Sequence, residues 1–183
     1  MVVFLAGCFV LDALALAPRT APARADVPSA RWWQGDCDVN RHAGSYRIAV
    51  WNGLVACGPL VASDAHPDMT ESLPGSAWGV LEWECVELSM RYMYLAWGVH
   101  PYPANGDQVV ANYATYKSSY NPNGPNLQVV TNGTVGAAPV AGDVLSYTTV
   151  HTSVVTGSTV NSSGNGTVYV IQENATANGL GTL

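Results

Sequence analysis

The chain has 183 residues, a length that suits one domain with a short appendage. Its formal net charge is −6, from 7 Lys and Arg against 13 Asp and Glu, and no basic run is present, which argues against a nucleic-acid partner. Only 11% of residues are charged and 48% are hydrophobic, so the composition also excludes a disordered chain.

Residues 1–25 have the features of an export signal. Residues 2–17 are almost wholly apolar but too short for a typical membrane span. The segment Ala23–Ala25 (ARA) resembles a cleavage site. We therefore expect a secreted, extracellular or wall-associated protein without stable membrane insertion after signal removal. Lipid attachment at the cysteine of Leu5–Cys8 (LAGC), or an uncleaved anchor, is the alternative.

Three cysteines remain after the signal, an odd number for a secreted protein. We expect a disulfide between Cys37 and Cys57, which closes a loop of about 20 residues and stabilises the fold by roughly 3 kcal/mol. Cys85 then stays free. A free thiol in an oxidising compartment is either buried and inert or chemically active, and the spacing alone does not decide between the two.

Local patterns predict one central helix with short strands around it. Residues 26–62 form an N-terminal extension with a strand-like run at Tyr46–Val50, and residues 63–79 read as a polar loop. Residues 81–97 contain no Gly or Pro and are followed by Gly98, which predicts a helix. After this helix we expect a short second helix at 107–117. Four β-prone runs follow it, at 127–131, 143–149, 151–157 and 167–173.

Three positions could meet in a catalytic site. Cys85 lies near the start of the predicted helix, where the positive helix end lowers the pKa of a thiol and N–H groups can bind an oxyanion. His151 opens a predicted strand. The polar residues 172–174 close the next strand, and one of them could accept a hydrogen bond from the histidine ring. Cysteine, then histidine, then an orienting residue is the papain-like order.

Four blocks resemble the CHAP family, the cysteine, histidine-dependent amidohydrolases and peptidases of bacterial cell-wall hydrolases. Residues 82–88 (EWECVEL), followed by Arg91, resemble the family block W-Q-C-V-E…R. Three further blocks resemble the family's strands in the same order: 139–147 (PVAGDVLSY), 151–155 (HTSVV) and 170–174 (VIQEN). The resemblance covers roughly residues 75–183.

The resemblance implies an α+β, papain-like domain over residues 63–183, with the nucleophile's helix packed on a small antiparallel β-sheet. It implies Cys85 as the nucleophile and His151 as the general base and acid. Asn174 is favoured as the residue that orients the histidine, because it keeps its place in an ungapped match. Glu173 is the alternative, and it would require a bulge or a shift of one residue.

The chain departs from the family pattern at three positions. Glu84 stands where the family often has Gln, Gln172 replaces the family's acid, and Val150 replaces a Gly before the histidine. Glu84, Gln172 and Trp83 are candidates for contacts with the oxyanion or substrate, although an ionised Glu cannot donate a hydrogen bond as Gln does. The Glu84 and Gln172 changes could also mark a hydrolase that has lost its activity.

Neither a cofactor nor a metal is expected. Asp36, Asp38 and Asn40 begin like a calcium loop, but Arg41 occupies the position that requires Gly. Family domains normally continue for one or two strands beyond the position of Leu183, so a C-terminal truncation with an open sheet edge is an alternative to consider.

The function implied by the resemblance is hydrolysis of peptidoglycan amides by a secreted, monomeric enzyme through a thioester acyl-enzyme. The cleaved bond lies either in the stem or cross-bridge peptide or at the muramoyl–alanine amide. The main alternative is a non-catalytic module that binds the cell wall or glycans by stacking tryptophans on sugar rings: Trp32, Trp33, Trp51, Trp78, Trp83 and Trp97. A third reading is an amidase of polyamine–peptide conjugates.

Overall fold

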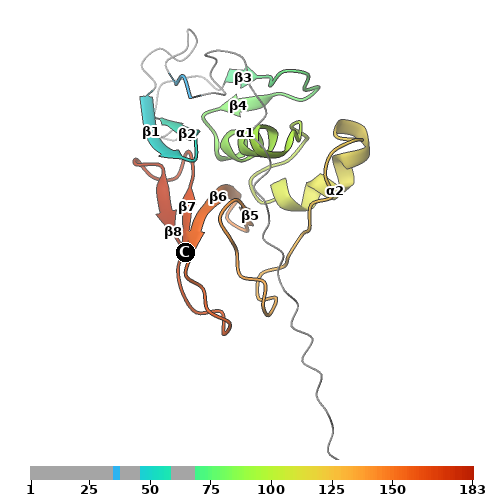
Figure 1. Ribbon diagram of the computed structural model, residues 1–183. Helices are drawn as coiled ribbons and strands as arrows, with labels where there is room; N and C mark the ends of the chain where they lie inside the picture. The colour runs from blue at the N-terminus through green and yellow to red at the C-terminus, as the bar shows by residue number, and fades with distance from the viewer. Residues whose placement is uncertain (1–34, 38–45, 59–68) are drawn as a thin grey trace, which may run out of the picture.

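The computed structural model describes residues 35–37, 46–58 and 69–183 (Figure 1). Within these residues the fold contains two helices, two two-stranded antiparallel sheets and one four-stranded antiparallel sheet. The expected α+β class is confirmed. The predicted export signal at 1–25 and most of the predicted N-terminal extension lie outside the described residues.

The first sheet is a hairpin of β1 (Tyr46–Trp51) and β2 (Leu54–Gly58). Asn52-Gly53 forms its two-residue turn, the preferred sequence for a tight hairpin. Strand β2 is buried along its whole length. Cys57 in this strand forms the expected disulfide with Cys37, with the two Cα atoms 5.5 Å apart. Such a bond is compatible with an oxidising, extracellular environment.

The second sheet pairs β3 (Met69–Glu71) with β4 (Val80–Glu82), immediately before helix α1 (Cys85–Trp97). The helix therefore begins four residues later than the predicted start at residue 81. Leu81 and Glu82, the first residues of the predicted helix, pair with β3 instead. This tertiary pairing overrides their local helix propensity. For the same reason a strand lies within the predicted loop at 63–79.

Helix α1 ends where the sequence predicts. Gly98 has φ +67°, and its N–H donates to the carbonyl of Tyr94. This left-handed conformation is readily available only to glycine, which explains why the helix stops here.

The remaining elements follow the predicted order with two differences. Helix α2 (Val109–Tyr120) replaces the short helix expected at 107–117. The β-prone run at 127–131 forms no strand, because most of its side chains remain exposed and the run has no pairing partner in the described sheets. The four-stranded sheet runs β5 (Val144–Tyr147), β6 (His151–Ser158), β7 (Val168–Ile171) and the unpredicted edge strand β8 (Leu180–Thr182).

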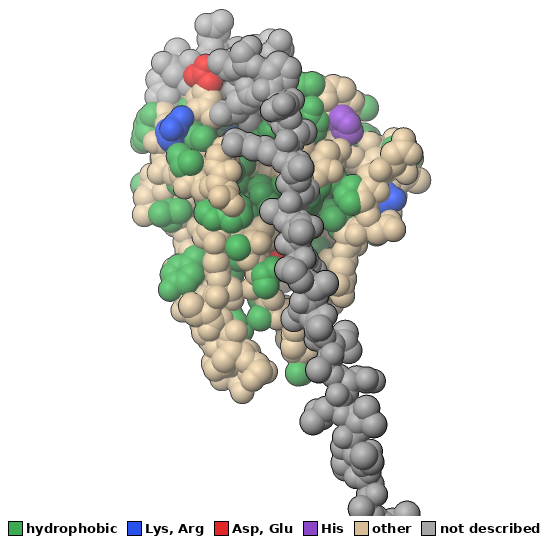
Figure 2. Space-filling view, in the orientation of Figure 1, with side chains coloured by type: hydrophobic (Ala, Val, Ile, Leu, Met, Phe, Trp, Pro, Cys, Tyr) green, Lys and Arg blue, Asp and Glu red, His purple; other side chains and the backbone are tan. Residues whose placement is uncertain are grey.

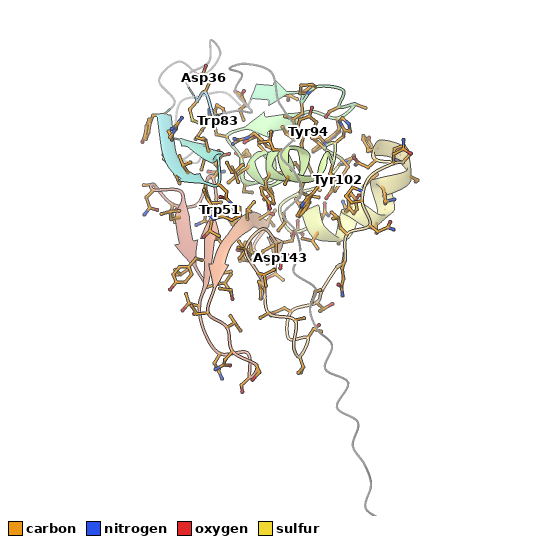
Figure 3. All side chains as sticks on the ribbon, in the orientation of Figure 1. Asp36, Trp51, Trp83, Tyr94, Tyr102 and Asp143 are labelled. Atoms are coloured by element: carbon orange, nitrogen blue, oxygen red, sulfur yellow. A yellow bond between two sulfur atoms is a disulfide. The ribbon has the colours of Figure 1, made fainter. Side chains whose placement is uncertain are left out.

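Helix α1 is the centre of the fold, between the two small sheets and the four-stranded sheet (Figure 1). On one face Leu88 packs with Val154 of β6 and Ile171 of β7. On another, Met90 belongs to a core cluster with Tyr102, which lies between the two helices (Figure 3). The start of the helix is thereby held against the start of β6.

The surface matches the low charge of the chain. On the face in Figure 2 charged side chains are few and separated by apolar and uncharged polar ones. No helix in the described ranges is long and apolar enough to cross a membrane.

Candidate active site

Cys85 is the first residue of α1, and its side chain is buried. Burial raises the pKa of the Cys85 thiol, the nearby charges of Glu84 and Glu173 raise it further, and hydrogen bonds from the backbone N–H groups of Thr152 and Val86 lower it. The raised pKa shows that burial and acids outweigh the lowering expected at a helix N-terminus. The resting thiol is therefore neutral at neutral pH.

His151 is the first residue of β6, and its ring is held from two sides. Its Nε2 lies 2.9 Å from Oε1 of Gln172. Because an amide oxygen only accepts, Nε2 carries the hydrogen in the neutral ring and Nδ1 has the lone pair. The ring also stacks on Tyr147, its pairing partner in β5, with centroids 5.6 Å apart and planes 21° apart. This geometry leaves Nδ1 as the nitrogen that can take a proton.

The start of β6 lies against the start of α1, which brings the cysteine and the histidine to the same place. The backbone of Thr152, the residue after His151, acts on the Cys85 sulfur and lowers the pKa of the thiol. Its side-chain Oγ1 lies 3.0 Å from Oγ of Ser89, one turn along the helix from Cys85. Both hydroxyl residues are completely buried, so this bond fixes the helix relative to the strand.

Gln172 is the residue of the 172–174 run whose bond to the His151 ring is seen, at 2.9 Å, whereas the favoured candidate Asn174 and the alternative Glu173 bond other groups. Asn174 donates from Nδ2 to Oε2 of Glu84, at 2.6 Å. Glu173 is completely buried and accepts from the backbone N–H of Cys57, at 2.6 Å. Neighbouring residues of an extended chain point to opposite faces. Gln172 therefore meets the histidine, while Glu173 points into the core.

Glu173 belongs to a buried group of charges. Arg91 is completely buried and bonds Glu87 through Nε, at 2.5 Å, and Glu173 through Nη2, at 3.1 Å. Glu82 is also buried and interacts electrostatically with the same guanidinium. Burial, and next the neighbouring Glu87, raise the pKa of Glu173 well above its ordinary value of 4.5, against the opposing effect of Arg91. Glu173 therefore keeps its proton to a higher pH than an exposed glutamate does.

The described tryptophans belong to the core. Trp83, a candidate for substrate contact, is 2% exposed, and its ring centroid lies 5.9 Å from the guanidinium carbon of Arg91 (Figure 3). Three others are half-buried and pack against the core clusters: Trp51, Trp78 and Trp97. Two lie outside the described residues: Trp32 and Trp33. Within the described ranges, no tryptophan forms an exposed platform for sugar rings.

Two of the contacts that hold His151 were missed by sequence reasoning. Gly106, in the loop before α2, lies so close that a Cβ added to it would be 2.7 Å from the Cα of His151. The stacking of Tyr147 depends on the register of the β5–β6 hairpin. The only sequence signal for Tyr147 was its place at the end of the 139–147 block.

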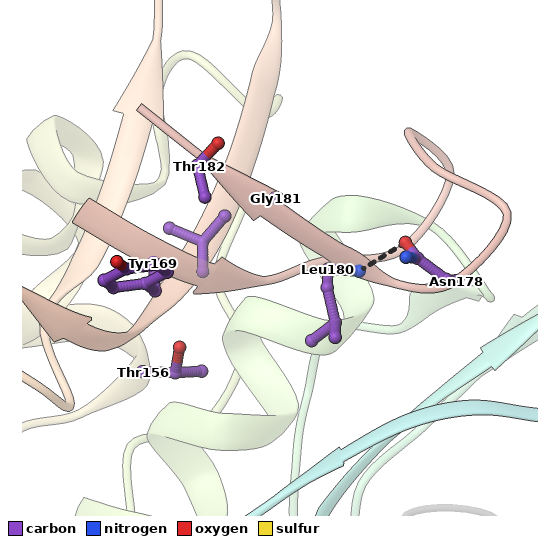
Figure 4. A pocket seen from close by; sticks show the side chains of 7 residues that line it. Thr156, Tyr169, Asn178, Leu180, Gly181 and Thr182 are labelled. Carbon is purple, nitrogen blue, oxygen red and sulfur yellow. Dashed lines mark hydrogen bonds between the residues drawn. The ribbon is translucent and has the colours of Figure 1, made fainter. Parts of the chain in front are cut away.

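Other parts of the described surface do not extend this site. No cluster of three or more His, Cys, Asp or Glu side chains that could hold a metal ion occurs in the described ranges. An open groove of about 410 Å³ lies over β6, β7 and β8, and Thr156, Tyr169 and Leu180 contribute to its lining (Figure 4). Neither Cys85 nor His151 lines that groove.

Comparison with protein-family models, curated proteins and solved structures found no match for this chain. The functional argument therefore depends on the residues themselves: a helix-terminal cysteine, a histidine fixed by an amide and a stacked ring, and the strand that joins them.

Proposed function

We propose that this protein is a secreted cysteine amidohydrolase or endopeptidase of the papain-like CHAP type, and that it cleaves amide bonds of peptidoglycan. The observation that supports the proposal is the packing of α1, which begins at Cys85, against β6, which begins at His151, with the His151 ring bonded to Gln172. Their order in the chain and the placement of Cys85 at a helix start support a Cys–His–amide arrangement. The peptidoglycan substrate is supported by the resemblance of the four sequence blocks, and secretion by the disulfide.

In the proposed reaction, Nδ1 of His151 takes the thiol proton as the Cys85 sulfur attacks the carbonyl carbon. The first N–H groups of α1, which have no partner within the helix, stabilise the oxyanion. The C–N bond then breaks, His151 gives the proton to the leaving amine, and a thioester remains. Water, deprotonated by His151, attacks the thioester. The C–S bond breaks, a carboxylic acid leaves and the thiol is restored.

Gln172 and Tyr147 are positioning residues in this scheme. The amide oxygen of Gln172 accepts from Nε2 and so keeps the lone pair of the neutral ring on Nδ1, the nitrogen that takes the proton in this scheme. Because the resting Cys85 thiol is neutral, its sulfur can attack only as its proton is transferred to His151. The reaction rate therefore depends more on the His151 tautomer than it would in a site with a preformed thiolate.

The proposal is tested by incubating the secreted protein with purified peptidoglycan and measuring loss of turbidity and release of amino groups. We expect Cys85→Ala to abolish release, and Gln172→Ala to reduce the rate by about 10-fold to 100-fold, since it removes only orientation. A matched control is Thr156→Ala, in the groove away from the site, which should keep the wild-type rate.

Hydrolysis that continues in Cys85→Ala would overturn the cysteine mechanism. If neither protein releases amines while both sediment with the wall, the chain is a binding module or an inactive relative of the hydrolases. The mass of the new soluble fragments identifies the cleaved bond.

A further inference from the structure

We propose that Gly181 is a positioning residue of the candidate active site, and that strand β8 thereby takes part in the proposed reaction. The inference rests on the proposed hydrolase function, and it concerns the tautomer of His151. Gly181 acts through Gln172. Because Gly181 has no side chain, the Gln172 amide has room for the one orientation that presents its oxygen to the histidine ring.

Strand β8 lies directly beside Gln172. Gly181 is the middle residue of β8 (Figure 4) and pairs with Val170 of β7. The pairing continues beyond the strand, because the N–H of Gln172 donates to the carbonyl of Gly179 at 2.9 Å. Gln172 is 8% exposed, so its side chain is enclosed by protein atoms. The place of its amide is therefore determined by β8 as well as by His151.

The carbonyl of Leu180 in β8 decides which end of the Gln172 amide faces the histidine. Nε2 of Gln172 lies 3.5 Å from the Leu180 oxygen and 3.5 Å from Oγ1 of Thr176. Thr176 donates its hydroxyl hydrogen to the same Leu180 oxygen, at 2.9 Å, so both oxygens near Nε2 are acceptors for it. The amide nitrogen therefore belongs on the β8 side, and the amide oxygen is left for Nε2 of His151, at 2.9 Å.

Gly181 leaves no space for a side chain on this side of the amide. A Cβ added to Gly181 would lie 2.6 Å from Nε2 and 3.3 Å from Cδ of Gln172, and 3.1 Å from a methyl carbon of Val170. An ordinary contact is about 3.5–4.0 Å long, so the amide would have to move by roughly 1 Å. Gly181 does not have positive φ, so its backbone conformation is open to any residue. The close approach of Gln172 is what requires a glycine here.

Displacing the amide affects the proposed base. Without the acceptor on Gln172, the hydrogen of the neutral His151 ring distributes between Nδ1 and Nε2. Molecules that carry the hydrogen on Nδ1 cannot take the thiol proton of Cys85 in the proposed scheme. A substitution at Gly181 should therefore lower kcat and leave KM nearly unchanged, because it removes the reactive tautomer and not a contact with the substrate.

The kinetic test measures the initial rate of amine release from purified peptidoglycan over a range of its concentration. We expect Gly181→Ala to lower kcat by about tenfold and to change KM by less than about twofold. In a Gln172→Ala background there is no amide to displace, so the same substitution should change the rate by less than about twofold. An equal loss in both backgrounds would mean that Gly181 does not act through Gln172.

Gly157→Ala is the matched control, because it makes the same change in the same sheet without a close approach. A Cβ at Gly157 would lie 3.9 Å from the Tyr169 ring, an ordinary contact, and Gly157 does not have positive φ. This variant should keep the wild-type kcat and KM. Urea unfolding of both glycine variants should give midpoints close to that of the wild type, which shows that a loss of rate is not a loss of folded protein.

Nitrogen NMR shifts of the neutral His151 ring measure the tautomer without any substrate. We expect the hydrogen on Nε2 in the wild type and in Gly157→Ala, and a mixture of the two tautomers in Gly181→Ala. A wild-type ring with its hydrogen on Nδ1 overturns the inference, as does a folded Gly181→Ala with the wild-type tautomer. Hydrolysis that persists in Cys85→Ala overturns the proposed function instead, and it leaves the comparison of tautomers valid.

Discussion

Val150 has a left-handed backbone conformation with φ +59°, directly before His151. A β-branched residue in this region costs about 1–2 kcal/mol. Its side chain is 58% exposed, so packing does not compensate for the cost. The conformation is imposed by the turn into β6, where the N–H of Val150 donates to the carbonyl of Tyr147 at 3.2 Å. Local strain is thus placed next to the proposed base, where it helps set the direction of the strand.

Replacing Val150 with Gly should raise the free energy of unfolding by about 0.5–1 kcal/mol. The change relieves the left-handed strain, and the gain is reduced by the greater entropy of Gly in the unfolded chain. Urea unfolding followed by tryptophan fluorescence measures the difference. Val135→Gly is the control, since Val135 is 92% exposed and does not have positive φ. It should lose a few tenths of a kcal/mol. Equal losses in both variants would contradict the strain argument.

At the scale of elements, the sequence predicts the central helix but not its first residue. Leu81 and Glu82 favour a helix locally, yet both pair with β3, a contact that local propensity does not contain. The difference matters for the proposed function, because Cys85 becomes the first helical residue. Its sulfur then meets the N–H of Val86 and lies at the helix end that borders β6.

The orienting residue illustrates a second limit of sequence reasoning. The run 172–174 is visibly polar, and alternation along a strand shows that its neighbours face opposite sides. Which member faces the histidine depends on the pairing of β6 with β7, and that pairing is irregular between Val155 and Gly157. A shift of one residue exchanges the two faces. The blocks single out the cysteine and the histidine as candidates, and their catalytic roles stay a prediction, whereas the choice among the three polar neighbours depends on a register that the blocks do not contain.

The buried charges between α1 and the end of β7 predict a dependence of stability on pH. The folded-state pKa of Glu173 is raised above 4.5, chiefly by burial. Its contribution to stability is therefore complete below the ordinary range of Glu and is lost as the pH rises through the folded-state pKa. Glu173→Gln imitates the protonated form. We expect this variant to lose less stability than wild type as the pH rises above the ordinary range of Glu, measured by urea unfolding.

Glu173→Ala separates the charge from the hydrogen bonds. Without the side-chain oxygen, the N–H of Cys57 and Nη2 of Arg91 lose an acceptor in the core, so we expect a loss of about 3 kcal/mol across the whole pH range. If Glu173→Gln showed the same pH slope as wild type, another group would be responsible for the titration.

At the scale of the whole molecule, the N-terminal hairpin shares the core of the proposed catalytic domain. Leu54 and Ala56 of β2 pack in one cluster with Leu88 of α1 and Val154 of β6. Cys57 also donates its N–H to Glu173, directly after Gln172. The described part of the extension therefore supports the end of β7 and, through it, the residue that orients the histidine.

The Cys37–Cys57 disulfide closes a loop with a sequence separation of 20 residues. Replacing both cysteines with Ala should lower the free energy of unfolding by about 3 kcal/mol, because the unfolded chain regains the entropy of that loop. Urea unfolding of the double variant measures this loss, and dithiothreitol should destabilise the wild type by a similar amount. Cys85→Ala, which leaves the disulfide intact, should respond to dithiothreitol as the wild type does. A double variant as stable as the wild type would show that β2 is held by its buried contacts alone.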